Sequence, residues 1–242
     1  MVARDLPGFG HARPLSNGDR HSVPNLADAV EGWIDEEGLE SPHLVGCSLG
    51  GAIALELAAR GRAKSATAIS PASGTTRGFE AEWAFRQVRQ IRDGARRMEK
   101  LGPERTRRLL DNPAIRLTLY TQFGRPYQQT TDSLLASQPL LANAPGFDDA
   151  NDSLFHEYSL IDVSAPRLAE VRVPTQILWG SRDLCLWPRQ ARRVADAIPG
   201  AKLRFLPGLG HLSMLDDPDL IAELVVDHAR GPRPGRGAPA LA

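Results

Sequence analysis

Ser48 stands where a short apolar strand gives way to an alanine-rich helix, in the run Gly46-Cys47-Ser48-Leu49-Gly50. In a strand-turn-helix setting, this G-x-S-x-G pattern leaves a serine hydroxyl exposed at the end of a sheet. We expect both outer glycines to be required, because such a strained turn needs neighbours without a Cβ. The positive end of the helix dipole then points at the reacting centre. Ser48 is therefore the candidate nucleophile.

Two later loops supply the groups that a serine nucleophile needs. A hydroxyl is a weak nucleophile, so it requires a base and a third group that orients the base. Asp183 follows a predicted strand that ends near Trp179, and His211 lies in a glycine-bearing loop after the next strand. Open α/β sheets place their sites at such strand ends. We expect His211 to deprotonate Ser48, Asp183 to hold its tautomer, and the Leu49 N–H to stabilise an oxyanion.

Other carboxylates and histidines compete for these roles. The nearest competing acids are expected to be helix caps or loop charges: Asp152, Asp162, Asp216 and Asp217. His11 follows a glycine turn, where a solvated side chain is the ordinary case. The remaining histidines are interpreted as structural: His21, His43, His156 and His228. Asp183 and His211 remain the candidate acid and base.

The residues that flank the two loops are candidates for substrate contact. Trp187 follows the acid loop and Leu212 follows the histidine, so we expect both to bind substrate. Cys47 and Cys185 are interpreted as packed apolar neighbours of the site and not as redox thiols. We expect no metal and no organic cofactor.

Hydrophobic spacing predicts the elements that position these residues. A helical stripe runs from Leu26 to Ile34 and stops at Gly38. Further elements follow as strands at 43–47, 63–70, 175–179 and 202–206, and as helices at 49–59, from about 188 and from 217–218. This alternation of strands and helices indicates a parallel sheet.

Composition divides the chain into a core, an insertion and a tail. Between Pro71 and Pro166 arginines cluster, strand patterns are scarce and helical spacing prevails. We therefore expect a core in two parts, 1–73 and 167–229, an inserted helical lid at 74–166, and a disordered tail at 230–242 that is rich in Gly, Pro and Arg.

Charge and cysteine usage limit the possible partners. The 242 residues carry 29 basic and 29 acidic side chains, which favours neither a nucleic-acid groove nor an anionic membrane surface. A small, mostly apolar substrate suits this balance. Two cysteines make no disulfide framework, and no stretch approaches the roughly 20 apolar residues of a membrane span. We expect a cytoplasmic protein.

The chain resembles the α/β-hydrolase superfamily, in its lidded serine-hydrolase branch, over residues 2–229. Four landmarks carry the resemblance in order: Ala3–Gly10 resembles the fourth strand and its turn, Val45–Gly51 the nucleophile elbow, Trp179–Asp183 the acid loop, and Gly210-His211 the histidine loop. The resemblance implies a mostly parallel, doubly wound α/β sheet with a helical lid over an apolar pocket. A serine nucleophile disfavours the aspartate-using relatives, the haloalkane dehalogenases and epoxide hydrolases.

The chain departs from the family pattern before Ala3, where nothing supplies the first three strands or the loop with the second oxyanion N–H. The missing third strand would lie between the fourth strand and the strand of the elbow. We therefore expect an N-terminally truncated fold, in which either the fourth strand slides to pair with the fifth or Met1 is internal to a longer protein. About ten ladder groups would lose partners, at roughly 1–3 kcal/mol each if they are buried and unsatisfied. The chain alone is then expected to be poorly soluble and nearly inactive.

The resemblance implies a Ser-His-Asp acyl-enzyme mechanism on a carboxylic ester, which is an esterase activity of class EC 3.1. Related activities stay open within the family: lactonase, thioesterase, carbon-carbon bond hydrolase and perhydrolase. The carbon-carbon hydrolases usually carry Asn where this chain has Cys47, which counts against them. The alternatives from another class are a catalytically impaired fragment or a ligand-binding protein of the same fold.

Overall fold

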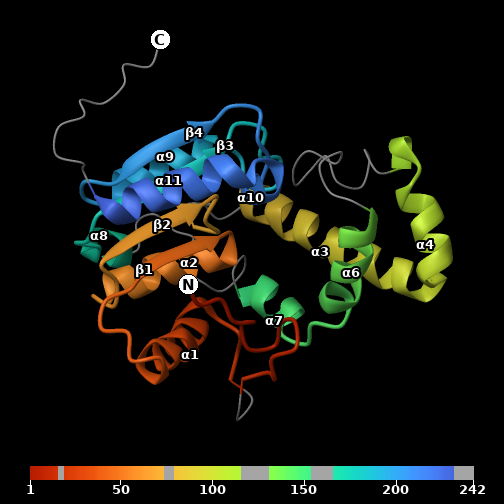
Figure 1. Ribbon diagram of the computed structural model, residues 1–242, viewed down its shortest axis with the longest axis horizontal. Helices are drawn as coiled ribbons and strands as arrows, with labels where there is room; N and C mark the ends of the chain where they lie inside the picture. The colour runs from red at the N-terminus through yellow and green to blue at the C-terminus, as the bar shows by residue number, and fades with distance from the viewer. Residues whose placement is uncertain (16–18, 74–78, 116–130, 154–165, 232–242) are drawn as a thin grey trace.

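The computed structural model describes residues 1–15, 19–73, 79–115, 131–153 and 166–231. Within these residues, a sheet of four parallel strands forms the centre of the molecule, in the order β1-β2-β3-β4 (Figure 1). The strands are β1 (His43–Cys47), β2 (Ser65–Ile69), β3 (Thr175–Gly180) and β4 (Lys202–Leu206). Each lies where the hydrophobic pattern predicts a strand. Because all neighbours are parallel, the loops that leave their carboxyl ends meet at one edge of the sheet.

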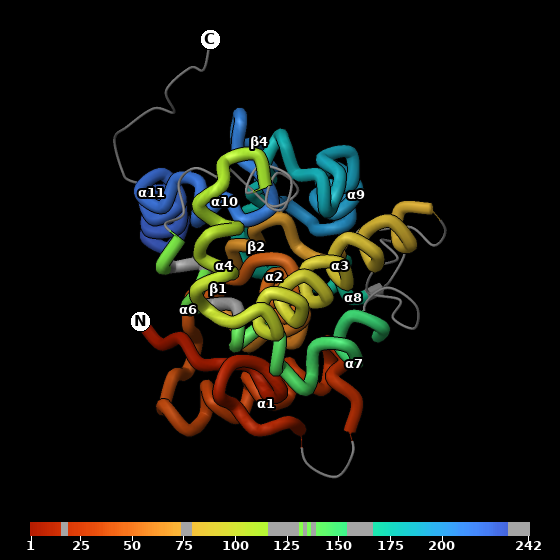
Figure 2. Tube along the Cα trace, turned by 90° about the vertical axis from the view of Figure 1, so that its right-hand side faces the viewer, coloured from red at the N-terminus to blue at the C-terminus, as the bar shows by residue number. Residues whose placement is uncertain are grey.

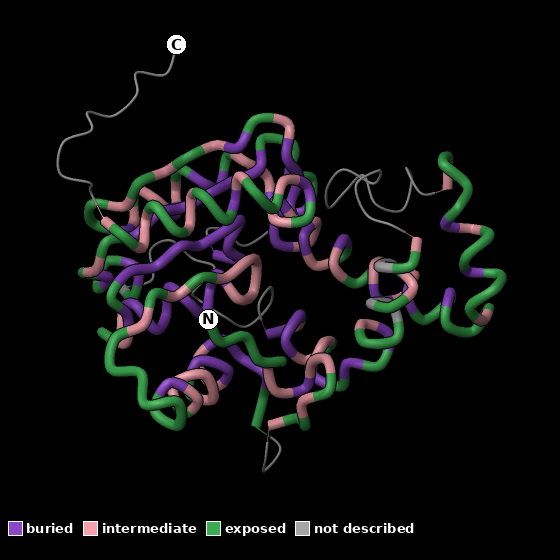
Figure 3. The backbone as a smooth tube through the Cα atoms, in the orientation of Figure 1, coloured by how far each residue is buried: buried purple, intermediate pink, exposed green. Residues whose placement is uncertain are grey.

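Helices cover both faces of this sheet: α1 (Val23–Glu36), α2 (Leu49–Ala59), α8 (Pro166–Glu170), α9 (Arg189–Ala197) and α11 (Pro218–Arg230). Successive side chains of a strand point to opposite faces. Ala68 and Ile177 accordingly join the core formed with α1, α2, α8 and α9, whereas Ile69 and Leu178 join a second core against α11. Figure 3 shows buried residues along the strands and the helix faces that cover them. This is the expected doubly wound α/β fold.

Two of the helices begin at residues whose side chains cap them. The Ser22 hydroxyl accepts the Asn25 N–H at 3.3 Å at the start of α1. The Asp217 carboxylate accepts the Leu220 N–H at 3.1 Å at the start of α11. Such caps satisfy N–H groups that have no partner within the helix. Just beyond α1, Gly38 takes a φ of +65°, which glycine adopts without strain.

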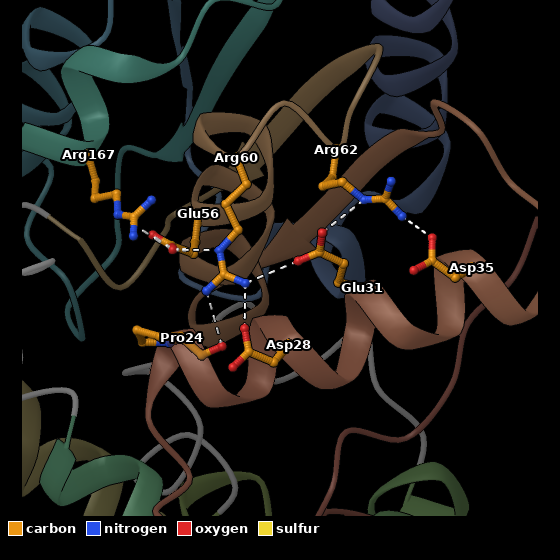
Figure 4. Close-up of polar contacts among 8 residues, drawn as sticks. All are labelled: Pro24, Asp28, Glu31, Asp35, Glu56, Arg60, Arg62 and Arg167. Carbon is orange, nitrogen blue, oxygen red and sulfur yellow. Dashed lines mark hydrogen bonds and ion pairs between the residues drawn. The ribbon is translucent and has the colours of Figure 1, made fainter.

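The α1 and α2 helices are joined by a network of ion pairs (Figure 4). Arg60 donates to Asp28 at 2.5 Å and to Glu31 at 3.2 Å on α1, and to Glu56 at 2.8 Å on its own helix. Glu56 is only 1% exposed and also lies 3.7 Å from Arg167 of α8. A buried carboxylate requires such partners. The network holds α2, and therefore Ser48 at its amino end, against the neighbouring helices.

The described part of the region between β2 and β3 consists mostly of helices joined by short turns. Its helices are α3 (Phe79–Leu101), α4 (Pro103–Leu110), α6 (Thr131–Ala142) and α7 (Phe147–Asp152). They lie to one side of the sheet, and Figure 2 looks onto them from that side. Within the described part of 74–166 there is no strand, in agreement with the predicted helical insertion. The boundaries of the insertion, and its role as a lid, stay predictions.

The insertion is attached to the core where α3 begins. Glu80 is 8% exposed and forms ion pairs with Arg189, at 2.6 Å, and with Arg193 of α9. Burial by itself would raise the pKa of Glu80, but the two arginines outweigh it and lower this pKa. Glu80 therefore stays charged and fixes α3 to α9. Beyond Arg230 and Gly231, the predicted tail at 230–242 lies outside the described residues.

The predicted strand at Ala3–Gly10 is wrong. Residues 1–6 form no strand, and only the turn at 7–11 is present. Two backbone hydrogen bonds of this segment are local: the Gly8 N–H donates to the Arg13 carbonyl, and the Phe9 N–H donates to the Leu6 carbonyl. A third is long-range, because the Gly8 carbonyl accepts the N–H of Gly146, the residue before α7, at 2.8 Å. The segment does not pair with β1. No strand is missing between two others either, because β1 is the end strand of the sheet in the described residues. A strand needs a neighbouring edge, and this segment packs on α1 and the insertion instead.

Candidate active site

Ser48 occupies a strained turn between β1 and α2. Its φ of +51° and ψ of −117° lie outside the usual regions for a residue with a side chain. Three backbone hydrogen bonds hold the turn: Ser48 donates to Ile69 at 3.0 Å, and its carbonyl accepts from Ala52 at 3.0 Å and Ala72 at 2.9 Å. The surrounding chain therefore imposes this conformation, and the Ser48 side chain is half-buried.

Of the two outer glycines predicted to be required around Ser48, only Gly46 has no room for a Cβ. A Cβ on Gly46 would lie 2.1 Å from the Gly50 carbonyl oxygen, so Gly46 must be a glycine. A Cβ on Gly50 would meet nothing within 4 Å, so the expected steric need for a glycine at position 50 is wrong. Gly51 instead allows a close approach, because its Cβ would lie 3.0 Å from Pro71. The turn is tight on the strand side and on the side of the following loop.

The structure brings Asp183 and His211 together. The Asp183 Oδ2 lies 2.9 Å from the His211 Nδ1, and the two residues are 1% and 4% exposed. The other oxygen, Oδ1, accepts the N–H groups of Cys185 at 2.9 Å and Leu186 at 2.8 Å. These bonds fix the carboxylate and stabilise its charge. An ionised Asp183 accepts the Nδ1 proton of His211, which leaves Nε2 without a proton in the neutral ring.

The acid loop and the histidine loop are bonded to each other through their backbones. Ser181 donates to Leu206 at 3.0 Å, and Arg182 donates to Leu209 at 2.9 Å. A Cβ on Gly180 would lie 2.2 Å from the Gly210 carbonyl oxygen, so only a glycine permits this approach. The distance between the acid and the histidine is therefore set by rigid backbone contacts at the ends of β3 and β4.

Cys47 connects the serine turn to the histidine loop. Its Sγ lies 3.6 Å from the His211 carbonyl oxygen, which places the residue before Ser48 beside the histidine. Burial, and secondarily the charge of Asp183, raises the pKa of the Cys47 thiol. The same causes raise the pKa of Cys185 well above its ordinary value. Both thiols stay protonated at neutral pH, which supports their interpretation as packed residues.

The Leu49 N–H is the first of helix α2, and the first four N–H groups of a helix have no partner within it. Together with the helix dipole, this group makes the amino end of α2 favourable for negative charge beside Ser48. In the turn at 7–11, the Gly8 N–H already donates to the Arg13 carbonyl and the Phe9 N–H to the Leu6 carbonyl, so neither group is available as a second oxyanion donor.

The two predicted substrate-binding residues flank the Asp183–His211 pair. Trp187 is half-buried, and its ring centroid lies 5.7 Å from that of Phe79 and 5.8 Å from that of Trp83, both on α3. The Arg189 guanidinium stacks 4.3 Å from the Trp187 centroid. Leu212 is half-buried at the start of the short helix α10 (Ser213–Asp216). Their contact with a substrate stays a prediction.

The competing acids have other partners. Asp152 pairs with Arg20 at 3.1 Å, and Asp217 caps α11. Asp216 is buried and accepts the Gly210 N–H at 2.7 Å, so it belongs to the histidine loop. Asp162 lies outside the described residues, as does His156. His11 is exposed, in agreement with a solvated turn residue.

Sequence reasoning missed a second histidine-carboxylate pair. The His21 Nδ1 lies 3.0 Å from the Asp149 Oδ2 of α7, and His21 is 7% exposed. The two residues are separated by 128 positions, so no local sequence pattern predicts the pair.

Within the described residues, no group of three or more His, Cys, Asp or Glu side chains is placed to hold a metal ion. None of the described helices has the length and apolar character needed to cross a membrane.

Comparison with known proteins identifies the family. Residues 3–224 match the alpha/beta hydrolase family. The chain is 32% identical to the epoxide hydrolase EphH of Mycobacterium tuberculosis, over 83% of this chain and 91% of that protein. This chain belongs to the alpha/beta hydrolase family.

Two further similarities agree with this assignment. The chain is 25% identical to 2-hydroxy-6-oxononadienedioate/2-hydroxy-6-oxononatrienedioate hydrolase 1 of Dechloromonas aromatica, over 94% of this chain and 75% of that protein. A putative lipase from Acinetobacter baumannii has the same fold, with a TM-score of 0.69 and 24% identity over 92% of this chain and 71% of that one. The family and these relatives make the protein a hydrolase.

Proposed function

We propose that this hydrolase cleaves a carboxylic ester or a related acyl compound through a Ser48 acyl-enzyme. The observation that carries the proposal is the buried Asp183–His211 pair, held at 2.9 Å, whose histidine contacts Cys47, the residue before a serine in a strained turn. A nucleophile, a base and a group that orients the base are the parts of a serine-hydrolase triad.

In the proposed mechanism, His211 Nε2 takes the proton of the Ser48 hydroxyl as its oxygen attacks the substrate carbonyl carbon. Asp183 stabilises the imidazolium that forms. The tetrahedral intermediate collapses when the C–O bond breaks and His211 gives its proton to the leaving alkoxide. Water, deprotonated by the same histidine, then attacks the acyl-enzyme and releases the acid and free Ser48.

Negative charge develops on the carbonyl oxygen during both steps. The Leu49 N–H at the start of α2 is the proposed donor to this oxygen. One such donor typically contributes about 10²- to 10³-fold to kcat. Trp187 and Leu212, on either side of the pair, are proposed to contact the apolar part of the substrate.

Epoxide hydrolysis is the second candidate, and the 32% identity to EphH favours it. Ser48 stands at the position where the aspartate-using epoxide hydrolases of this family would carry a carboxylate, and this weighs for acyl transfer. A ligand-binding protein of the same fold would keep the architecture without turnover.

A fluorophosphonate probe combined with substrate turnover tests the proposal. Intact mass should rise by one adduct, peptide mapping should place it on Ser48, and Ser48→Ala should not label. The same preparation should hydrolyse p-nitrophenyl butyrate, and styrene oxide should be turned over far more slowly. Labelling that persists in Ser48→Ala contradicts the nucleophile, whereas preferred turnover of styrene oxide supports the epoxide alternative. A folded chain with neither labelling nor turnover points to the binding protein.

A further inference from the structure

We propose that Asp216 is a positioning residue for His211. The inference rests on the proposed function, because it assigns Asp216 to the support of the proposed base. Asp216 and Ser213 lie in the turn that follows His211, and their side chains return to the residue that precedes it.

The contacts of Gly210 define this support. The Asp216 Oδ2 accepts the Gly210 N–H at 2.7 Å, and the Ser213 hydroxyl donates to the Gly210 carbonyl at 2.7 Å. Asp216 is 2% exposed and Ser213 is fully buried. The short helix α10 thus binds both the N–H and the carbonyl of Gly210. Asp216 holds the peptide group between Leu209 and Gly210, and Ser213 holds the peptide group between Gly210 and His211, so neither rotates freely while its bond persists.

Burying a carboxylate at Asp216 is a costly way to bind one backbone N–H, so its use at this position needs a reason. A buried carboxylate is tolerated only with hydrogen-bonding partners, and a charge-assisted bond to an N–H is stronger than a neutral one. A serine or asparagine would cap a surface loop at less cost. We infer that the carboxylate stiffens the chain at Gly210, through the peptide group that joins Leu209 to Gly210.

The position of Gly210 explains why that stiffness matters for the reaction. Its carbonyl oxygen packs against Gly180, where an added Cβ would come within 2.2 Å. Gly180 in turn precedes Asp183, whose N–H donates to the Gly180 carbonyl at 3.2 Å. A movement of Gly210 would therefore change the register of the histidine loop on the acid loop, and with it the His211–Asp183 distance. A misplacement of about 1 Å can lower a rate by about 10²-fold.

Three variants test the proposal: Asp216→Ala, Asp216→Asn and, as a matched control, Asp217→Ala. Asp217 is the next residue and also caps a backbone N–H, but that N–H belongs to α11 and not to the histidine loop. We expect Asp216→Ala to lower kcat for p-nitrophenyl butyrate by about 10²-fold with little change in KM. Asp216→Asn keeps an acceptor oxygen and should restore most of kcat. Asp217→Ala should lower the Tm and leave kcat unchanged.

If Asp216→Ala does not fold, Ser213→Ala replaces it, because this variant removes the other bond to Gly210 and is expected to lower kcat about tenfold. A kcat within about threefold of wild type in both alanine variants overturns the proposal. Equal losses in Asp216→Asn and Asp216→Ala also overturn it, because an acceptor oxygen at position 216 would then not be what supports His211. A wild-type protein that neither labels at Ser48 nor turns over ester fails the proposed function itself, and this result is distinct from a failure of the variants.

Discussion

In the part of the chain that the structure describes, two histidine-carboxylate pairs have nearly the same geometry and different surroundings. His211 and Asp183 lie 2.9 Å apart, and His21 and Asp149 lie 3.0 Å apart, in each case through Nδ1 of the ring. Their side chains are 5% and 0% exposed in the first pair, and 9% and 32% in the second. The difference lies in what else each pair touches.

The second pair connects elements and leaves no nitrogen for chemistry. His21 Nε2 lies 3.5 Å from the Leu15 N–H, and the ring packs against Gly8 and Gly146. The His21 N–H also donates to Asp149 at 2.5 Å. The pair thus fixes the segment before α1 to α7 of the insertion.

The first pair instead lies beside a strained serine. Cys47, the residue before Ser48, contacts the His211 carbonyl, and helix α2 begins directly after Ser48. Such neighbours are what make a histidine-carboxylate pair a candidate for catalysis. The pair alone can also act as a structural clip, which means that it only holds two parts of the chain together.

Histidine replacement gives the largest contrast between the pairs. His211→Ala should lower kcat on esters by roughly 10⁵- to 10⁶-fold, since loss of the base removes the activation of Ser48. His21→Ala should change kcat by less than about threefold and lower the Tm by several degrees, because it removes a buried ring. Steady-state kinetics and thermal unfolding of both variants measure this. A large loss of kcat in His21→Ala would place the second pair in the reaction.

Carboxylate replacement sharpens the comparison. Asp183→Asn should keep the fold and lower kcat by up to about 10⁴-fold, through loss of the correct His211 tautomer. Asp149→Asn should leave kcat within about threefold of wild type. A fall of less than about tenfold in Asp183→Asn would assign the acid to another residue.

Close-packed glycines also leave room for each pair, and replacing one of them by alanine should give a smaller effect. A Cβ on Gly180 would press on the Gly210 backbone, which cannot yield, so Gly180→Ala should lower kcat by about 10²-fold. A Cβ on Gly146 would lie 2.6 Å from the His21 ring, and Gly146→Ala should lower the Tm with kcat unchanged. Circular dichroism checks that both variants are folded. Equal kcat values for the two variants would show that loop register does not control the reaction.

The sequence predicts the first pair and its elements well, for identifiable reasons. Apolar runs bounded by glycines place β1 and α2 at their observed bounds, and Asp217-Pro218 marks the start of α11. Asp183 and His211 follow buried strands, and parallel pairing forces such loops together. These signals are local in the chain.

The features that sequence reasoning missed depend on long-range contacts. The segment at 3–10 has a strand-like pattern, yet its backbone hydrogen bonds join it to nearby residues of the chain and to Gly146 and not to another strand. His21 and Asp149 are 128 positions apart. From the sequence, Asp216 is expected to be a helix cap or a loop charge, and only the structure shows that it is buried and bonded to Gly210. Tertiary packing decides each of these cases.

The smallest expected effect is the dependence of stability on pH that Asp149 of the second pair contributes. Burial alone would raise the pKa of Asp149, but hydrogen bonds from His21 and an ion pair with Arg20 outweigh it and lower this pKa. A carboxyl whose folded pKa is depressed stabilises the fold above its unfolded pKa, which is about 3.9. That contribution is lost as the pH falls through the lower folded value.

The Tm difference between wild type and Asp149→Asn should therefore be constant from neutral pH down to about pH 5 and shrink below about pH 4. Thermal unfolding between pH 7 and pH 3 measures it. Asp132→Asn is the matched control, because Asp132 pairs with Arg107 at a side chain that is 77% exposed, and exposed pairs contribute little. Its Tm should follow wild type at every pH. A difference for Asp149→Asn that grows in acid would show that the carboxylate opposes folding, and the second pair would then not be the clip that joins α7 to the segment before α1.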